Sequence, residues 1–251
     1  MPADYANNSP AMIGSAKGSL MYWLLLFILM SFSSPAMGYE EVVVANGGRV
    51  GGFVKVEGKV VKGGYLEVTK NREVCGKVVD ESLVVGVGQG VRYAVVTLEG
   101  VSKGKVVERE AVHELDNAKC RFVPHVQAAS VGQFLMMKNS DPILHTVHAY
   151  TPDGQPQFNV GLYPGRVSRK ALVSSGVIKI LCEAHPWMRA YVAVSEHPYY
   201  AVTDLYGEYQ ITDIPAGSYR LKVWHESLGV EEKRVEIKGG AVSKVDFMLS
   251  T

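Results

Sequence analysis

Three side chains that bind soft metals lie within one short segment: a thiol at Cys182, an imidazole at His185 and a thioether at Met188. The segment is CEAHPWM, so the donors are three residues apart, and it lies between the apolar runs VIKIL (177–181) and YVAV (191–194), which favour strands. A tight loop between two strands can direct all three side chains at one point. Thiolate and thioether with imidazole suit copper better than a hard cation. The pattern therefore predicts a copper site.

A copper site of two imidazoles, one thiolate and a weak axial thioether needs a second histidine from elsewhere in the chain. The segment NSDPILHTVH (139–148) offers two candidates, His145 and His148. Zinc is a competing metal, because one Cys and two His could hold it, but a thioether is a poor zinc ligand. A nucleophilic role for Cys182, with His145 or His185 as base, is a further alternative. We expect no enzymatic activity, because neither an oxyanion loop nor a third orienting group occurs at a recognisable spacing.

The elements around these segments are predicted to be strands. Short runs such as RYAVVTL (92–98) and SYRLKV (218–223) alternate or concentrate apolar residues, with glycines between the runs. A long segment with a helical period is missing from the sequence, and so is an alternation of strands with helices. The 251 residues are 47% hydrophobic, which argues against disorder, and the net charge of +1 gives no electrostatic case for nucleic acid. We therefore predict an all-β protein.

The N-terminus has the pattern of a secretory signal peptide. Lys17 precedes the unbroken apolar run LMYWLLLFILM (20–30), and the small-x-small exit AMG (36–38) follows it. A run of 11 residues is shorter than the ~20 residues that span a bilayer. We predict a signal peptide over residues 1–38, a periplasmic or secreted protein and no membrane span after cleavage. An uncleaved N-terminal anchor is the alternative.

The two metal-binding segments resemble the cupredoxins, and within them the amicyanin-like and plastocyanin-like branch. The resemblance lies in the short C-x2-H-x2-M loop, in the upstream N-x5-H-T-V-H stretch and in RFVP (121–124) followed by Val131-Gly132. It implies one redox-active copper ion, Cu(I)/Cu(II), with His145, Cys182, His185 and Met188 as ligands. Asn139 would tie the two ligand loops together, and His148 would fall on the family's non-ligand histidine, so it is the alternate.

This resemblance implies a Greek-key β-sandwich over residues 117–195 that carries electrons to a redox partner protein, such as a cytochrome or a periplasmic oxidoreductase. The edge of His185, set in the apolar patch of Pro186 and Trp187, would be the port through which electrons leave. A non-redox copper-binding module, or a structural or interaction module of the cell envelope, is the alternative function.

The flanks resemble one carboxypeptidase-regulatory-like, or transthyretin-like, β-sandwich that is split in two. Residues 47–58 and 93–100 resemble its first strands, and TDLYGEYQI (203–211) with IPAGSY (214–219) resembles its continuation. We expect a first part at 42–115 and a second part at 196–251, with the copper domain inserted between them. Two separate small modules are the alternative.

The three cysteines of the chain are Cys75, Cys120 and Cys182. In an oxidising compartment two of them should pair, and the resemblance assigns Cys182 to the metal. We therefore predict a Cys75–Cys120 disulfide that closes a loop of about 45 residues.

Overall fold

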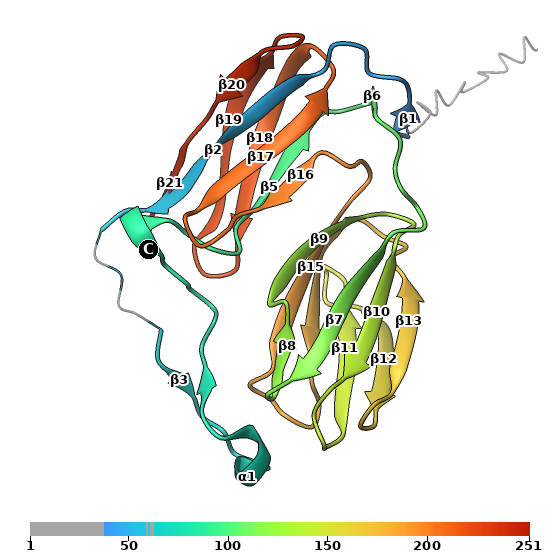
Figure 1. Cartoon of the computed structure of the whole chain (residues 1–251), viewed down its shortest axis with the longest axis vertical. Helices are drawn as coiled ribbons and strands as arrows, with labels where there is room; N and C mark the ends of the chain where they lie inside the picture. Colours follow the sequence, from blue (N-terminus) through green and yellow to red (C-terminus); the bar gives the residue numbers. More distant parts are fainter. Residues whose placement is uncertain (1–37, 59, 61–62) are drawn as a thin grey trace, which may run out of the picture. The chain divides into compact units, whose positions relative to one another are not determined.

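A computed structural model of the chain describes residues 38–58, 60 and 63–251, and these residues are almost entirely β (Figure 1). The all-β class expected from the sequence is confirmed. The expected signal peptide lies outside the described residues, apart from Gly38. Among the helices that the structure describes, none has the length and apolar character needed to cross a membrane.

Residues 112–195 form a β-sandwich of two sheets, which we call the middle sandwich. One sheet has the order β13-β10-β7-β8 and the other the order β12-β11-β14-β15-β9. The strands of the first sheet are β7 (Val112–Ala118), β8 (Arg121–Val123), β10 (Phe134–Asn139) and β13 (Val167–Ala171). Those of the second are β9 (Val126–Ser130), β11 (His145–Tyr150), β12 (Pro156–Leu162), β14 (Gly176–Leu181) and β15 (Arg189–Ser195). Alternate residues of β10 and β15 are buried, as the pleat of a half-buried strand requires.

Strands from both sides of the middle sandwich pair with one another to form a second unit, the flank sandwich. Its sheets have the orders β16-β5-β18-β19 and β17-β2-β20, and β21 also pairs with β2 (Figure 1). Two of these strands precede the middle sandwich, β2 (Gly48–Val56) and β5 (Val95–Glu99). The others follow it: β16 (Tyr200–Val202), β17 (Glu208–Ile214), β18 (Gly217–His225), β19 (Gly229–Ile237), β20 (Val242–Lys244) and β21 (Phe247–Leu249). The two sandwiches have separate apolar cores.

The limit between the two sandwiches lies earlier in the chain than the sequence suggested. Strand β7 begins at Val112 and pairs with β10 from Val112↔Phe134 to Asn117↔Asn139. Residues 112–115, expected at the end of the first flank, therefore belong to the middle sandwich and supply a strand of it.

Residues 63–91 connect β2 to β5, and part of this stretch, around Leu83, Val85 and Val91, packs on the flank sandwich. They carry a two-residue ladder of β3 (Tyr65–Leu66) with β4 (Val78–Val79), the short helix α1 (Arg72–Cys75) and the 3-10 turn η1 (Val87–Gln89). We call residues 65–80 the cover segment. Its buried side chains belong to the core of the middle sandwich and not to that of the flank sandwich: Val68, Cys75 and Val78. A second short ladder joins β1 (Glu40–Glu41) to β6 (Lys103–Gly104).

Candidate metal centre

Three buried donor atoms converge at one end of the middle sandwich. His145 opens β11, Cys182 directly follows β14, and His185 lies in the loop between β14 and β15. Sγ of Cys182 lies 3.8 Å from Nδ1 of His145 and 3.7 Å from Nδ1 of His185. One ligand atom from each of the three residues lies within 4.8 Å of the others.

These separations fit two nitrogens and one sulfur bound to a single ion. With a metal–sulfur bond of about 2.3 Å and a metal–nitrogen bond of about 2.0 Å, tetrahedral to trigonal angles place the two ligand atoms roughly 3.5–3.7 Å apart. The observed distances are 3.7 Å, at the upper limit of that range, and 3.8 Å, which is 0.1 Å above it. The side chains are therefore already arranged as a metal-binding set.

Each imidazole is oriented by an oxygen that accepts from Nε2, the ring nitrogen that faces away from Cys182. Nε2 of His145 lies 3.0 Å from Oδ2 of Asp141, and Nε2 of His185 lies 3.0 Å from Oδ1 of Asn71. An oxygen acceptor at Nε2 favours the tautomer with its proton there, which leaves the Nδ1 lone pair facing Cys182. Metal-binding histidines are commonly held in this way by a carboxylate or carbonyl oxygen.

The surroundings of Cys182 lower the pKa of its thiol. Burial opposes ionisation, but the polar contact with His145 and the hydrogen bonds with Thr146 outweigh it, so that the pKa of Cys182 lies below its usual value. Thr146 donates its backbone N–H to the sulfur over 3.4 Å. Because the thiolate and not the thiol binds metals, this environment favours metal binding.

His185 is neutral at physiological pH in this environment. Burial, together with the nearby His145 and Lys70, lowers its pKa to about 4. A neutral imidazole keeps the lone pair that a metal ligand requires.

The loop from Cys182 to Met188 is closed by its own backbone. The N–H of Met188 donates to the carbonyl of His185 over 2.9 Å, and the N–H of Cys182 donates to the carbonyl of Met188 over 3.3 Å. Met188 is buried in the core of the middle sandwich together with Cys182 and Trp187. The structure thus places all four expected ligands at this end of the sandwich, and the thioether of Met188 remains a predicted ligand.

His148 lies on the opposite side of β11 from His145. Because successive residues of a strand face opposite sides, His145 is buried with Val147, whereas His148 is partly exposed. Its Nδ1 lies 2.5 Å from Oε1 of Glu183 and 2.8 Å from the hydroxyl of Tyr150. The geometry therefore favours His145 over His148 as the second imidazole.

Asn139 and Thr146 hold the two ligand segments in place by different contacts. Asn139 donates to the carbonyls of Ile143 and Leu162, so it braces the loop before His145 against β12. The link between the two ligand segments is made by Thr146, whose hydroxyl accepts from the N–H of Glu183 over 2.7 Å. The tie between loops that was expected of Asn139 is thus made by Thr146, which the sequence did not single out.

Asp141 connects the metal centre to the disulfide. Its carboxylate accepts from the backbone N–H groups of Lys119 and Cys120 at 2.7 and 2.8 Å, in addition to Nε2 of His145. Lys119 and Cys120 both have positive φ, as in the tight turn of a two-residue hairpin. Cys120 also approaches Asp141 and His145 closely enough to form a second donor cluster, but its sulfur is in the disulfide.

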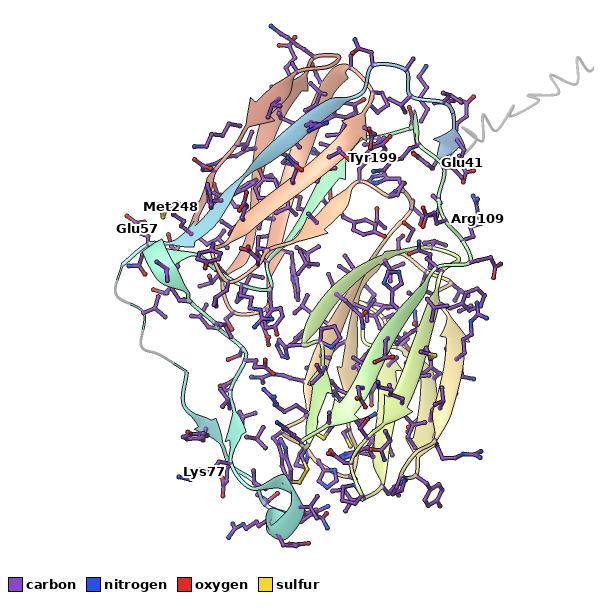
Figure 2. All side chains as sticks on the ribbon, in the orientation of Figure 1. Glu41, Glu57, Lys77, Arg109, Tyr199 and Met248 are labelled. Atoms are coloured by element: carbon purple, nitrogen blue, oxygen red, sulfur yellow. A yellow bond between two sulfur atoms is a disulfide. The ribbon has the colours of Figure 1, made fainter. Side chains whose placement is uncertain are left out.

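The predicted Cys75–Cys120 disulfide is confirmed. The two residues are separated by 45 positions, and the bond joins the cover segment to the turn between β7 and β8. It is the yellow bond between two sulfur atoms in Figure 2.

The expected electron port at His185 is covered. His185 is 1% exposed and Trp187 is 8% exposed, and the indole of Trp187 donates to the carbonyl of Cys120 over 3.1 Å. Asn71 of the cover segment contacts Nε2, the nitrogen at the edge of the ring. This contact could not be predicted from residue spacing, since Asn71 is 114 residues away from His185.

No protein-family model matches the chain, and no curated protein matches it. Among solved structures, a purple cupredoxin from Nitrosopumilus maritimus is 24% identical, with 33% of this chain and 98% of that chain covered and a TM-score of 0.30. An amicyanin from Paracoccus versutus is 16% identical, with coverages of 36% and 85% and a TM-score of 0.31. A copper-containing nitrite reductase from Thermus scotoductus is 22% identical, with coverages of 35% and 23% and a TM-score of 0.31. Similarity at this level assigns no function to this chain.

Proposed function

We propose that this protein binds one copper ion between His145, Cys182 and His185, with Met188 as a weak fourth ligand, and that it carries electrons outside the cytoplasm. The observation that supports this most is the convergence of two imidazole Nδ1 atoms on one thiolate sulfur, with each Nε2 already committed to an oxygen. A buried thiolate with imidazoles selects a soft metal.

The chemistry that copper supplies when bound is the gain and loss of one electron. The residues of the chain contribute a fixed geometry: Asp141 and Asn71 hold the two rings, and Thr146 holds the sulfur. Burial of His145, Cys182 and His185 excludes water from the donor atoms. A site whose ligands do not move on redox change allows fast electron transfer.

The proposed partner is a redox protein, and the proposed location is the periplasm or the exterior, as the N-terminal sequence pattern suggests. A carrier needs no catalytic group beside the metal, so we propose electron carriage and not catalysis.

A copper-holding module without a redox partner is the second candidate. The observation in its favour is the burial of the ligands, because His145, Cys182, His185 and Met188 are each at most 3% exposed. Reversible voltammetry, with electron exchange between oxidised and reduced copies, would support the carrier, and a protein that holds only Cu(I) would support the module.

Titration of the purified metal-free protein with Cu(II) tests the proposal. One equivalent should produce an intense thiolate-to-copper absorption in the visible range and the paramagnetic resonance spectrum of a single centre. The variant Cys182→Ser should stay colourless and bind copper much more weakly, because the thiolate supplies both the charge and the chromophore. A colourless wild-type protein that binds zinc in preference to copper would contradict the proposal.

A further inference from the structure

We propose that the cover segment (65–80) is a closed lid on the imidazole edge of His185, with Asn71 as the residue that positions the ring and the Cys75–Cys120 disulfide as its fastening. This inference rests on the proposed function and adds to it. It means that electrons do not leave through the edge of His185 while the disulfide is closed.

The side chain of Asn71 does not make the hydrogen bond that is usual for its position at the start of a helix. It occupies the N-cap position of α1, where an Asn usually accepts from a backbone N–H of the first helical turn, but it makes no such side-chain bond. Its Oδ1 instead lies 3.0 Å from Nε2 of His185. The contact at the metal centre therefore takes the place of a helix cap.

The backbone of the cover segment is shaped for this contact. Asn71 has φ 50° and ψ 42°, the left-handed conformation that Asn and Gly adopt most easily. The guanidinium Nε of Arg72 donates to the carbonyl of Val68 over 2.8 Å, which holds the turn around Asn71.

The cover segment is attached to the middle sandwich by three kinds of contact. The disulfide joins Cys75 to Cys120. Val68 and Val78 are buried in the core that also contains Trp187 and Met188. On the polar side, Oδ1 of Asp80 lies 3.4 Å from a guanidinium nitrogen of Arg189.

Two residues, Asp141 and Trp187, link the disulfide to the metal centre. Asp141 accepts from the N–H of Cys120 and from Nε2 of His145. Trp187 packs on His185, with ring centroids 5.1 Å apart, and its indole donates to the carbonyl of Cys120. Opening the disulfide therefore releases the lid from the turn at Cys120, which is linked to His145 through Asp141 and to His185 through Trp187.

The test is the solvent exchange of the Nε2 proton of His185, followed by nitrogen-edited NMR in the metal-free full-length protein. In wild type the proton should be visible and slow to exchange. Asn71→Gly suits the left-handed backbone but removes the oxygen, so exchange should be at least tenfold faster, whereas Asn71→Asp keeps an acceptor and should keep the proton protected. Asn46→Gly is the matched control, because Asn46 also has positive φ (60°) but lies before β2 of the flank sandwich.

The variant Cys75→Ala/Cys120→Ala tests the fastening. Its Nε2 proton should also exchange at least tenfold faster than in wild type, and after copper loading its electron self-exchange should be faster by a similar factor. Wild-type exchange rates in Asn71→Gly would overturn the lid, even if the double cysteine variant failed to fold. Because the proton is observed without metal, a protected proton in a protein that fails to bind copper would overturn the proposed function and leave the lid standing.

Discussion

Thr146 contacts Cys182 through two of its groups: its backbone N–H lies 3.4 Å from the sulfur, and its hydroxyl lies 3.7 Å from it. The same hydroxyl accepts from the N–H of Glu183, so one side chain both polarises the sulfur and joins β11 to the ligand loop. Hydrogen bonds around a cysteine sulfur tune the potential of a copper site.

Thr146→Val should therefore lower the reduction potential of the copper-loaded protein. The reduced site holds more negative charge on sulfur, and the lost hydroxyl would have stabilised it by ~1 kcal/mol, or about 40 mV for one electron. Voltammetry of wild type and variant measures the shift. Thr146→Ser, which keeps the hydroxyl, is the matched control, and an equal shift in both variants would count against the hydrogen bond as the cause.

His145→Gly should open one position of the metal site that added imidazole can refill. The buried ring lies against Cys182 and its removal leaves a space of the same shape, so the visible absorption should weaken and then recover on addition of imidazole. His148→Ala is the control, because His148 faces Glu183 and Tyr150. Loss of colour in His148→Ala, but not in His145→Gly, would show that the wrong imidazole had been chosen.

Met188→Leu should leave the protein coloured and raise its reduction potential. An axial thioether is a long, weak ligand that tunes the site and contributes little to metal affinity. The exchange conserves volume in a side chain that is 1% exposed, so its cost in stability should be below about 1.5 kcal/mol. Voltammetry with a parallel thermal unfolding curve checks both expectations, and an unchanged potential would exclude the thioether from the ligand set.

Removal of the disulfide should lower the free energy of unfolding by roughly 2–4 kcal/mol, because the unfolded chain gains the entropy of a 45-residue loop. Denaturant unfolding of Cys75→Ala/Cys120→Ala in the metal-free state measures this. Peptide mapping of the wild-type protein under non-reducing conditions should find Cys75 joined to Cys120. A Cys75–Cys182 peptide would mean that the metal thiolate is not free.

The stability of the metal-free protein should fall as the pH drops below about 6.5. Burial lowers the pKa of His197 and of His225, so the unfolded chain takes up protons at a pH where the folded chain does not. Each such group reduces the free energy of unfolding by up to about 1.4 kcal/mol per pH unit until the pH reaches its folded pKa.

Asparagine substitutions identify these two groups. Nδ1 of His197 accepts from the N–H of Tyr199, and Nδ1 of His225 accepts from the N–H of Ser227. Asn can supply an acceptor near the same place without titrating. His197→Asn/His225→Asn should reduce the slope of stability against pH below 6.5, and the contribution of His185, whose pKa burial also lowers, should remain. An unchanged slope would assign the whole pH dependence to other residues.

The spacing of residues in the sequence was sufficient to predict the parts of the site whose residues lie close together in the chain. The three donors of CEAHPWM share one loop, and strand alternation separates the buried His145 from the partly exposed His148. Asp141 was missed although it lies only four residues before His145, because a carboxylate in a turn is ordinarily solvated. Asn71 could not be found, since its contact depends on how the cover segment crosses from one sandwich to the other.

The split of the flank sandwich determines the order in which the chain can fold. The middle sandwich is built from consecutive strands, β7 to β15, so it can close as soon as residue 195 is available. Strand β2 pairs with β17, β20 and β21, where Arg49 meets Val242 and Val54 meets Phe247, so it stays unpaired until the end of the chain arrives. Pairings so distant in sequence form slowly, and an unpaired strand edge favours aggregation in the interval. The middle sandwich would thus be complete first, while β2 still lacks its partners β17, β20 and β21.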